Sequence, residues 1–350
     1  MRRIILFITL FFAITGASAA IGELKQKLKQ LAGDNNVGIA VISCYGDTVA
    51  VNGNEIFDMA SVAKFHQAVA LSKTLSFEQM ADTKIEIDPR TLEHNTWSPM
   101  RAAAGTDTII LSPAHLLDYS LMMSDNNAAD ILFDRYNSPT MVDSILRRLG
   151  YPGEYSIRFT EKQMHTDSLG ACNISSPLAA VAAINRFFAS DTTASATLIK
   201  AIMSRDTPFG KERIMAGLEG KGAKVFHKTG TGFNGTNGTP LAINDLAFVS
   251  YPTSWGYGCY SIAVFLKDFK GSKAEGEKLI ADISSAVWDA VMVNEVNMMN
   301  MSATIGASKK NGSAPAEAQS ATSFLGSFLG AVGGAILEEA LDRALGIEEF

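Results

Sequence analysis

The sequence predicts an α+β fold in which both ends of the chain share one antiparallel sheet and a helical subdomain is inserted between its strands. Two observations predict it. From about residue 21, the sequence shows the pattern of a helix followed by that of a strand. The stretch that ends near residue 291 shows two strand patterns followed by a helix pattern. The stretch between them is mostly helical in pattern. A cleft between sheet and helices is the expected place for a site.

The first helix has apolar residues at helical spacing, at Ile21, Leu24, Leu28 and Leu31. Gly33 to Asn36 ends it before the strand-like run from Val37 to Ser43. Toward the other end, Asn244 to Pro252 and Tyr260 to Asp268 are predicted strands. A helix follows them, with apolar positions at Leu279, Ile280, Ile283, Val287 and Val291.

In the predicted helical subdomain, two helices have clear N-terminal capping signals. Ser112-Pro113 and Ser138-Pro139 each combine an N-cap serine with proline at the first helical position, and the second helix is expected to end at Gly150. If the first predicted strand pairs with the last, Cys44 lies near Cys259, which predicts a disulfide. With Cys172 the chain has three cysteines, so one intramolecular disulfide is the most it can form.

The two termini differ from the rest. Residues 1–19 combine Met1-Arg2-Arg3, an apolar run and Ala17-Ser18-Ala19, which predicts a signal peptide cleaved near Ala19 and export to the periplasm. The folded domain is predicted over 20–296. Residues 297–350 are predicted to be a low-complexity linker, a glycine-rich apolar run and an amphipathic end. We expect a disordered extension there, with self-association or membrane-surface contact as the alternative.

Composition excludes several classes. The chain has 350 residues, 47% of them hydrophobic, as in globular proteins. Its net charge of -6 comes without a basic stripe, so we expect no nucleic-acid partner. Its histidines form no HExxH-type pair and its cysteines are not at metal-ligand spacing, so we expect neither a metal nor another cofactor.

Ser61 and Lys64 are the first candidates for chemistry. At the first turn of a helix, residues three apart face the same side, so the lysine amine can take the serine proton. A solvated serine beside a surface lysine is the alternative. Ser124-Asp125-Asn126 lies at a break between two helices, where Ser124 could relay a proton and Asn126 could hold a substrate amide. A helix-capping cluster is the alternative there.

Lys228-Thr229-Gly230-Thr231 follows a strand-like run. Gly230 allows a substrate to approach the backbone, Lys228 and Thr229 could bind a carboxylate, and the N–H groups of Thr231 and Ser61 could form an oxyanion hole. An edge strand running into a turn is the alternative. The combination of all three motifs argues against the structural alternatives.

In these motifs the chain resembles the serine β-lactamases and penicillin-binding proteins, which share Ser-x-x-Lys, Ser-Asp-Asn and Lys-Thr-Gly. The resemblance spans roughly residues 21–294. It implies an α+β fold of three layers (α/β/α), with a five-stranded antiparallel sheet flanked by the N- and C-terminal helices and an inserted all-helical subdomain.

Glu161 resembles the glutamate that activates the deacylating water in class A β-lactamases. Its Glu-x-x-Met-His context is similar to that of the PER and CfxA type (class A2) branch. His165 stands where most class A enzymes have asparagine, so it is either a water-positioning candidate or a ring that stabilises the loop. Trp97 resembles the aromatic residue at the substrate entrance, with a buried core position as the alternative.

The resemblance implies hydrolysis of β-lactam antibiotics through an acyl-enzyme, with Ser61, Lys64, Ser124 and Glu161 catalytic and cephalosporins preferred. A D-alanyl-D-alanine peptidase or esterase on the same fold, or a non-catalytic β-lactam sensor, is the alternative. We expect a monomeric catalytic domain.

Overall fold

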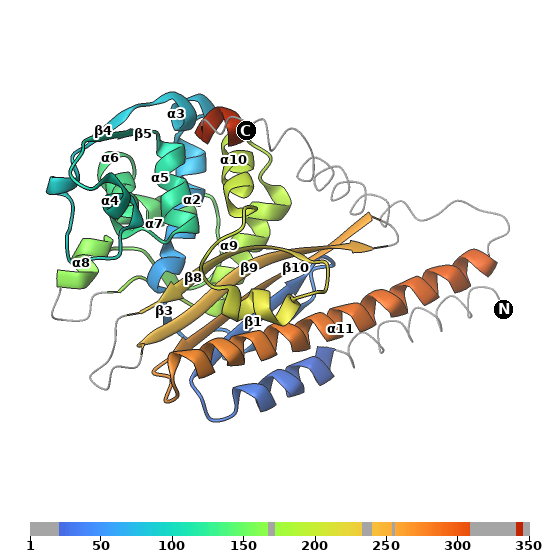
Figure 1. Cartoon of the computed structure of the whole chain (residues 1–350). Helices are drawn as coiled ribbons and strands as arrows, with labels where there is room; N and C mark the ends of the chain where they lie inside the picture. The colour runs from blue at the N-terminus through green and yellow to red at the C-terminus, as the bar shows by residue number, and fades with distance from the viewer. Residues whose placement is uncertain (1–20, 167–171, 233–239, 254–255, 309–340, 346–350) are drawn as a thin grey trace.

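A central sheet separates two helical layers in the computed structural model, which describes residues 21–166, 172–232, 240–253, 256–308 and 341–345. A long C-terminal helix and the helix 21–32 cover one face of the sheet, and the inserted helical subdomain covers the other (Figure 1). The predicted three-layer α+β fold is confirmed.

The sheet joins the two ends of the folded region. Its strand order is β2-β1-β10-β9-β8, and each neighbouring pair is antiparallel. β1 pairs with β10 from Val37 opposite Leu266 to Ser43 opposite Tyr260. The strands are β1 (Val37–Ser43), β2 (Thr48–Val51), β8 (Lys224–Thr231), β9 (Ala242–Thr253) and β10 (Gly256–Lys267).

One face of the sheet packs on α11 (Lys273–Ser308) and the helix 21–32. Leu24 and Leu28 are buried there with Ile280 and Ile283 in one apolar cluster. Helix α11 continues beyond residue 296, so residues 297–308 are helical rather than the predicted linker. The physical reason is that the sequence from Asn297 to Ile305 contains no glycine or proline and includes helix-forming methionine and alanine.

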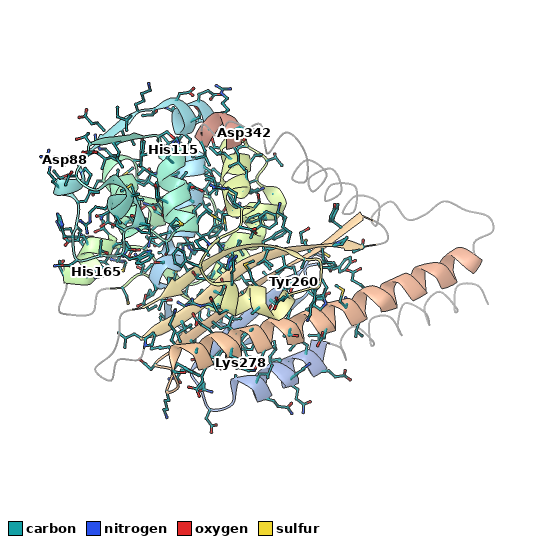
Figure 2. The ribbon with its side chains drawn as sticks, viewed as in Figure 1. Asp88, His115, His165, Tyr260, Lys278 and Asp342 are labelled. Carbon is teal, nitrogen blue, oxygen red and sulfur yellow. The ribbon has the colours of Figure 1, made fainter. Side chains whose placement is uncertain are left out.

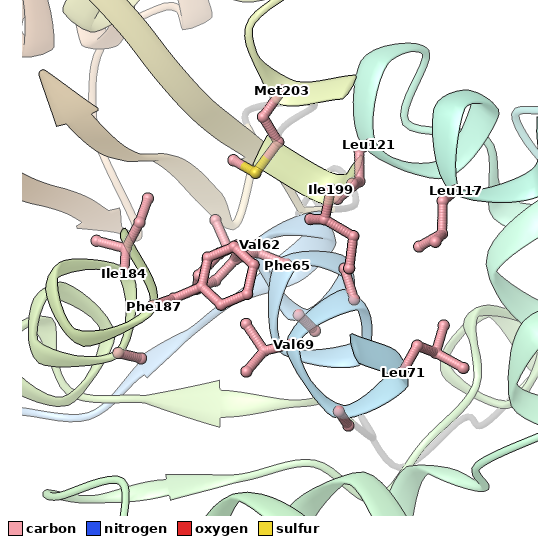
Figure 3. Close-up of a cluster of buried hydrophobic side chains, with 14 of the residues drawn as sticks. Val62, Phe65, Val69, Leu71, Leu117, Leu121, Ile184, Phe187, Ile199 and Met203 are labelled. Atoms are coloured by element: carbon pink, nitrogen blue, oxygen red, sulfur yellow. The ribbon is translucent and has the colours of Figure 1, made fainter. Parts of the chain in front are cut away.

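The other face packs on the helical subdomain, whose central helix α2 is buried on nearly all sides. Phe65 and Val69 of α2 pack in the same core as Ile184 and Phe187 (Figure 3). The helices of this layer are α2 (Ala63–Thr74), α3 (Phe77–Asp82), α4 (Pro99–Ala104), α5 (Pro113–Met122), α6 (Asn126–Arg135), α7 (Pro139–Arg148), α8 (Glu161–Thr166), α9 (Pro177–Ser190) and α10 (Ala194–Met203).

Short elements complete the fold, and two of them help to build the site. These are η1 (Ala60–Val62), just before α2, and η3 (Lys211–Met215), which lies beneath β8. The others are β3 (Phe57–Asp58), β4 (Ile85–Ile87), η2 (Pro89–Thr91), β5 (Ile109–Leu111), β6 (Tyr155–Ser156), β7 (Ile174–Ser175) and η4 (Ala216–Leu218).

The predicted helix starts are confirmed. The Ser112 hydroxyl accepts a hydrogen bond from the His115 N–H at the start of α5, and the Ser138 hydroxyl accepts one from the Met141 N–H at the start of α7. Helix α7 ends at Arg148, and Gly150 follows with a φ of +71° that favours glycine.

The end of the chain departs in part from the expected disordered extension. Residues 341–345 are helical, and Leu341 and Ala344 are buried against the helical subdomain. The predicted signal peptide and the glycine-rich run, with Gly326, Gly330 and Gly334, lie outside the described residues. None of the helices that the structure describes combines the length and apolar character of a bilayer-spanning segment.

Candidate active site

The structure brings the three sequence motifs to one place between the sheet and the helical subdomain. Ser61 lies on η1, Ser124 lies in the loop between α5 and α6, and Lys228 lies on β8. The Lys64 ammonium nitrogen is 2.8 Å from Ser61 Oγ and 2.6 Å from Asn126 Oδ1. It is also 2.8 Å from Glu161 Oε1, and the Lys64 side chain is only 1% exposed. Lys64 therefore links the predicted nucleophile to the predicted base.

The backbone is held in an unusual conformation at two points of this site. Ala60, directly before Ser61, has a φ of +45°, and Ser124 has a φ of +54°. Non-glycine residues rarely adopt these values, and such strain persists where the surrounding contacts enforce it. Here the Ala60 N–H donates to Asp58 Oδ1 at 2.8 Å. The strain fixes the position of both serine side chains.

Lys228 is the second buried amine of the site. Its Nζ donates to Ser124 Oγ and to the Thr229 carbonyl, each at 2.9 Å. Burial, and next the charge of Lys64, lower the pKa of Lys228 well below its usual value. A lysine in this state gives up its proton more readily to the hydroxyl that it contacts.

Gly230 lets β8 lie directly against η1. A Cβ atom at this position would be 2.4 Å from the Met59 carbonyl oxygen. The whole Lys-Thr-Gly-Thr motif lies in β8 and pairs with β9, so it belongs to the strand rather than to a turn after it. Thr229 is half-buried and Thr231 is exposed on the neighbouring stretch of that strand.

Arg213 of η3 is a residue of this site that the sequence analysis missed. Its guanidinium donates to Thr231 Oγ1 at 2.7 Å and to the Gly230 carbonyl at 2.9 Å, and it pairs with Glu277 at 3.1 Å. It thus adds a buried positive charge behind Thr231. No local pattern around Arg213 distinguishes it from a surface arginine.

Glu161 begins α8, and α6 fixes its position. Asp130 accepts hydrogen bonds from the N–H groups of Glu161 (2.7 Å) and Lys162 (2.8 Å). Burial raises the pKa of Asp130 to about 7. The sequence analysis missed Asp130, although its helical spacing of four residues from Asn126 was a usable signal.

The segment before α8 is held by a second missed residue. Asn173 Oδ1 accepts from the N–H groups of Arg158 and Phe159, and its amide donates to the Phe159 carbonyl at 2.8 Å. Because Asn173 is buried, these contacts fix the chain that leads to Glu161.

His165 of α8, labelled in Figure 2, is connected to Asn126 through one hydroxyl. The Asn126 amide donates to Thr96 Oγ1 at 2.7 Å, and Thr96 Oγ1 lies 3.1 Å from His165 Nε2. Partial burial lowers the pKa of His165, which favours the neutral ring. The contact of His165 with Thr96 connects α8 to the start of α6. This contact supports the interpretation that the His165 ring stabilises the loop.

Trp97 is not a core residue, because its side chain is 54% exposed. Its ring N–H donates to the Met123 carbonyl at 2.9 Å, and Phe209 meets the ring edge to face, with centroids 5.5 Å apart. The Trp97 carbonyl accepts from the Asn126 N–H. An exposed, anchored ring therefore stands next to the Ser124 to Asn126 loop.

Across the described ranges, no group of three or more His, Cys, Asp or Glu side chains is arranged to hold a metal ion.

Comparison with known proteins gives one family. The model of the beta-lactamase enzyme family matches residues 23–291. A beta-lactamase of Phocaeicola vulgatus is 35% identical over 265 residues, which cover 74% of this chain and 81% of that protein. The extended-spectrum beta-lactamase PER-1 of Pseudomonas aeruginosa is 29% identical over 79% of this chain and 90% of its own. The crystal structure of the TLA-1 extended-spectrum beta-lactamase superposes with a TM-score of 0.71 at 30% identity, covering 78% of this chain and 99% of that one.

Proposed function

Since this chain belongs to the β-lactamase enzyme family and hydrolyses β-lactam antibiotics as a class A serine enzyme, we propose specific roles for its residues. Ser61 is the nucleophile, Lys64, Ser124 and Glu161 transfer protons, and Asn126, Lys228, Thr229, Gly230, Thr231 and Trp97 bind the substrate. The contacts of Lys64 Nζ with Ser61 Oγ and Glu161 Oε1, both at 2.8 Å, carry this proposal.

Acylation begins at Ser61. Lys64 takes the proton of Ser61 Oγ, with which it is in direct contact. Ser61 Oγ bonds to the lactam carbonyl carbon, and the N–H groups of Ser61 and Thr231 stabilise the oxyanion. Ring strain and this stabilisation drive the opening of the ring.

The lactam nitrogen leaves with a proton from Ser124. Lys228 Nζ contacts Ser124 Oγ at 2.9 Å and can replace that proton, as its lowered pKa favours. Lys228 together with Thr229 and Thr231 binds the substrate carboxylate, with Arg213 as a further positive charge behind Thr231. The exposed ring of Trp97 stacks on the substrate at the entrance.

Deacylation uses Glu161 as the base for a water molecule. The two N–H bonds to Asp130 and the short contact with Lys64 hold Glu161 at the site. His165 positions that water indirectly, through Thr96 and Asn126. The water oxygen bonds to the acyl carbon while its proton passes to Glu161. The bond between the acyl carbon and Ser61 Oγ breaks as Lys64 returns the proton to Ser61 Oγ. Glu161 then releases its proton to solvent, and Lys228 regains one from solvent.

Glu161→Gln tests these roles most directly. We expect this variant to be acylated by nitrocefin and to remain acylated, seen as a stable mass increase of the intact protein, while Ser61→Ala is never acylated. Glu154→Gln, at an exposed glutamate, is the matched control and should turn over normally. Rapid turnover by Glu161→Gln would exclude Glu161 as the deacylation base.

We also propose that cephalosporins are the preferred substrates. Similarity to PER-1 and TLA-1, both named extended-spectrum enzymes, supports this preference. The kcat/KM values for one penicillin, one third-generation cephalosporin and one carbapenem would decide it. A higher value for the penicillin would overturn the preference without affecting the assignment as a β-lactamase.

We also propose that the protein is exported and acts as a monomer. Residues 1–19 act as a cleaved signal peptide, and the mature enzyme works as a monomer in the periplasm. N-terminal sequencing of the secreted protein should begin after Ala19, and light scattering should give the mass of one chain.

A further inference from the structure

The C-terminal segment Leu341–Leu345 returns to the helical subdomain. Leu341 is 9% exposed and Ala344 is 2% exposed, and both belong to the apolar core that includes the sheet-facing side of that subdomain. Their spacing of three residues places them on one side of the helical turn. Asp342 and Arg343 are exposed on the other side. The segment is therefore amphipathic, and its apolar side is covered.

Helix α3 provides the charged part of this contact. The Arg343 guanidinium lies 3.6 Å from Asp82 and over the ring of Phe77, with Cζ 5.3 Å from the ring centroid. Hydrogen bonds from its own backbone N–H and from the Ser76 hydroxyl are the main causes that lower the pKa of Glu78, and the charge of Arg343 lowers it further. A positive side chain of the tail thus contacts one carboxylate and one aromatic ring of α3.

Helix α5 provides a directional hydrogen bond. His115 Nδ1 accepts from the Ser112 N–H in the capping box and lies 2.7 Å from Ser112 Oγ. Since Nδ1 accepts this bond, the ring hydrogen lies on Nε2, which donates to the Leu345 carbonyl at 3.2 Å. Figure 2 shows His115 and Asp342 in the same part of the molecule.

The chain is long enough for this contact within one molecule. Helix α11 has 36 residues, so it spans about 54 Å. Residues 309–340 could cover up to about 110 Å if fully extended. The return therefore requires no second copy of the chain.

We propose that residues 341–345 are a docking segment that binds, within the same chain, the surface formed by Phe77 and Asp82 of α3 and His115 of α5. The contact attaches residues 341–345 to the helical subdomain of their own chain. The tail is then an internal partner of the helical subdomain rather than a membrane anchor.

Carbodiimide cross-linking of the full-length Arg343→Lys variant tests the proposal. This variant places an amine opposite Asp82 and Glu78, and coupling forms an amide with loss of one water. We expect peptide mapping to find position 343 joined to α3, and the added Asp82→Asn change to reduce the yield several-fold. The matched control is Asp342→Lys in place of Arg343→Lys, since Asp342 is exposed and no ion pair among the described residues joins it to α3. Absence of a link to α3, or an equal link from position 342, overturns the proposal.

Isotope mixing distinguishes a contact within one chain from a contact between two chains. The Arg343→Lys protein is prepared with 14N and with 15N, and the two are mixed in equal amounts before coupling. An internal contact gives only cross-linked peptides with one isotope. Mixed-isotope pairs at about half of the total would show exchange between chains and overturn the assignment.

Two cysteines, Cys44 and Cys259, lie opposite each other just after the C-terminal end of β1. The Cys44 N–H donates to the Cys259 carbonyl at 3.0 Å and continues the β1–β10 register beyond Ser43 and Tyr260. The structure does not contain the predicted disulfide, because all three cysteines are free thiols, with Cys259 buried and Cys44 half-buried. Cys259 belongs to the core on the helical-subdomain side of the sheet, and Cys44 packs against that core. Both side chains therefore lie on the same face.

This register gives the pair a geometry that a disulfide can use. Directly opposed residues of an antiparallel pair have Cα atoms about 4.5–5.5 Å apart, within the range that disulfides span. A hydrogen bond from the Cys259 thiol is the largest cause that lowers the pKa of Cys44. Cys44 is thus the more nucleophilic and the more exposed of the two sulfurs.

The geometry points to a disulfide between Cys44 and Cys259, formed by exchange with an external disulfide such as that of an oxidoreductase or oxidised glutathione. The Cys44 thiolate attacks that disulfide and releases one thiol of the carrier. Cys259 then loses its proton and attacks the Cys44 sulfur, releasing the second thiol. The protein loses two hydrogens, and the carrier disulfide gains them.

Oxidised glutathione is the probe, and Cys172 is the internal control. After incubation of the full chain, non-reducing peptide mapping should join the Cys44 and Cys259 peptides, while Cys172 carries glutathione or stays free. The oxidised protein should melt several degrees higher than the reduced protein, and Cys44→Ser should abolish the difference. Alkylation of both Cys44 and Cys259 after this treatment overturns the assignment.

Discussion

At the scale of single residues, His66 shows how tightly the helix of the nucleophile is packed. It is 1% exposed on α2, its Nδ1 lies 3.4 Å from the Val62 carbonyl, and its Nε2 has no hydrogen-bond partner among the described residues. Phe65 and Tyr155 flank the ring. Burial lowers the pKa of His66 to about 4. The neutral ring is therefore part of the core behind Ser61.

This burial predicts acid sensitivity. The folded-state pKa of about 4 lies below the ordinary value of 6.5, so protons bind the unfolded chain more readily. The stability due to the neutral ring is complete above pH 6.5 and falls as the pH decreases toward 4, by up to about 3 kcal/mol. Asp143 of α7, the charged group that faces this ring, opposes the effect.

Urea unfolding at pH 7 and pH 4.5 measures the effect. His66→Phe keeps an aromatic ring but cannot be protonated, so its loss of stability between these pH values should be smaller than that of the wild type. His94→Phe, at an exposed histidine, should behave like the wild type. An unchanged pH dependence in His66→Phe would contradict the role of burial.

At the scale of elements, contacts between neighbouring helices position Glu161, the proposed base for deacylation. Asp130 of α6 accepts both N–H groups at the start of α8, which holds Glu161 next to Lys64. Asp130→Asn replaces one acceptor oxygen by a donor, which disrupts one of these bonds. We expect deacylation to slow about 10- to 100-fold, the value of one hydrogen bond to a charged group.

Pre-steady-state nitrocefin kinetics separate the two steps. For Asp130→Asn we expect a burst whose rate is close to that of the wild type, followed by slow turnover. Asp134→Asn is the matched control on the same helix, because Asp134 is exposed. Equal slowing of both steps would instead indicate general damage to the site.

The contact between β8 and η1 depends on Gly230, which has no side chain. Gly230→Ala would place a Cβ 2.4 Å from the Met59 carbonyl oxygen, so the strand must move away from the nucleophile. We expect kcat/KM to fall about 100-fold, as even a 1 Å displacement can cost this much. Gly22→Ala, where a Cβ meets no atom within 4 Å, should keep full activity. Circular dichroism checks that both variants fold.

At the scale of the whole molecule, one core joins the sheet to the helical subdomain. Phe226, Phe248 and Phe265 of the sheet belong to the same apolar cluster as Leu116 and Phe187 of the helices. Phe188 stacks on Phe248 with ring centroids 4.6 Å apart. Neither layer covers its apolar face alone, so we expect the two to unfold together.

Tryptophan reporters test this cooperativity. Trp97 lies in the helical subdomain and Trp288 lies on α11, against the opposite face of the sheet. Two full-length variants each keep one of these residues, with the other tryptophans replaced by phenylalanine. In each variant, the urea unfolding curve from tryptophan fluorescence should coincide with the curve from far-UV circular dichroism of the same variant. A plateau in either curve would show that the layers unfold separately.

The sequence by itself determined the elements and the chemistry that they carry. Apolar spacing and N-cap signals are local, so they predicted the first strand at Val37–Ser43 and the starts of α5 and α7. The shared sheet followed from the order of these elements. The identity of the family followed from motifs whose reactive residues lie within a few positions of each other.

Only the tertiary structure decided how these residues act on one another. Asn173 and Arg213 gain their roles from contacts between distant segments, which no local pattern encodes. The spacing of Asp130 from Asn126 indicates a shared helix face, but not the segment at the start of α8 that Asp130 holds. The same holds for the tail, because the amphipathic pattern of residues 341–345 shows an apolar side but not the surface that covers it. Burial and partner choice depend on the packed molecule, so the lowered pKa values of Lys228 and His66 are properties of the fold.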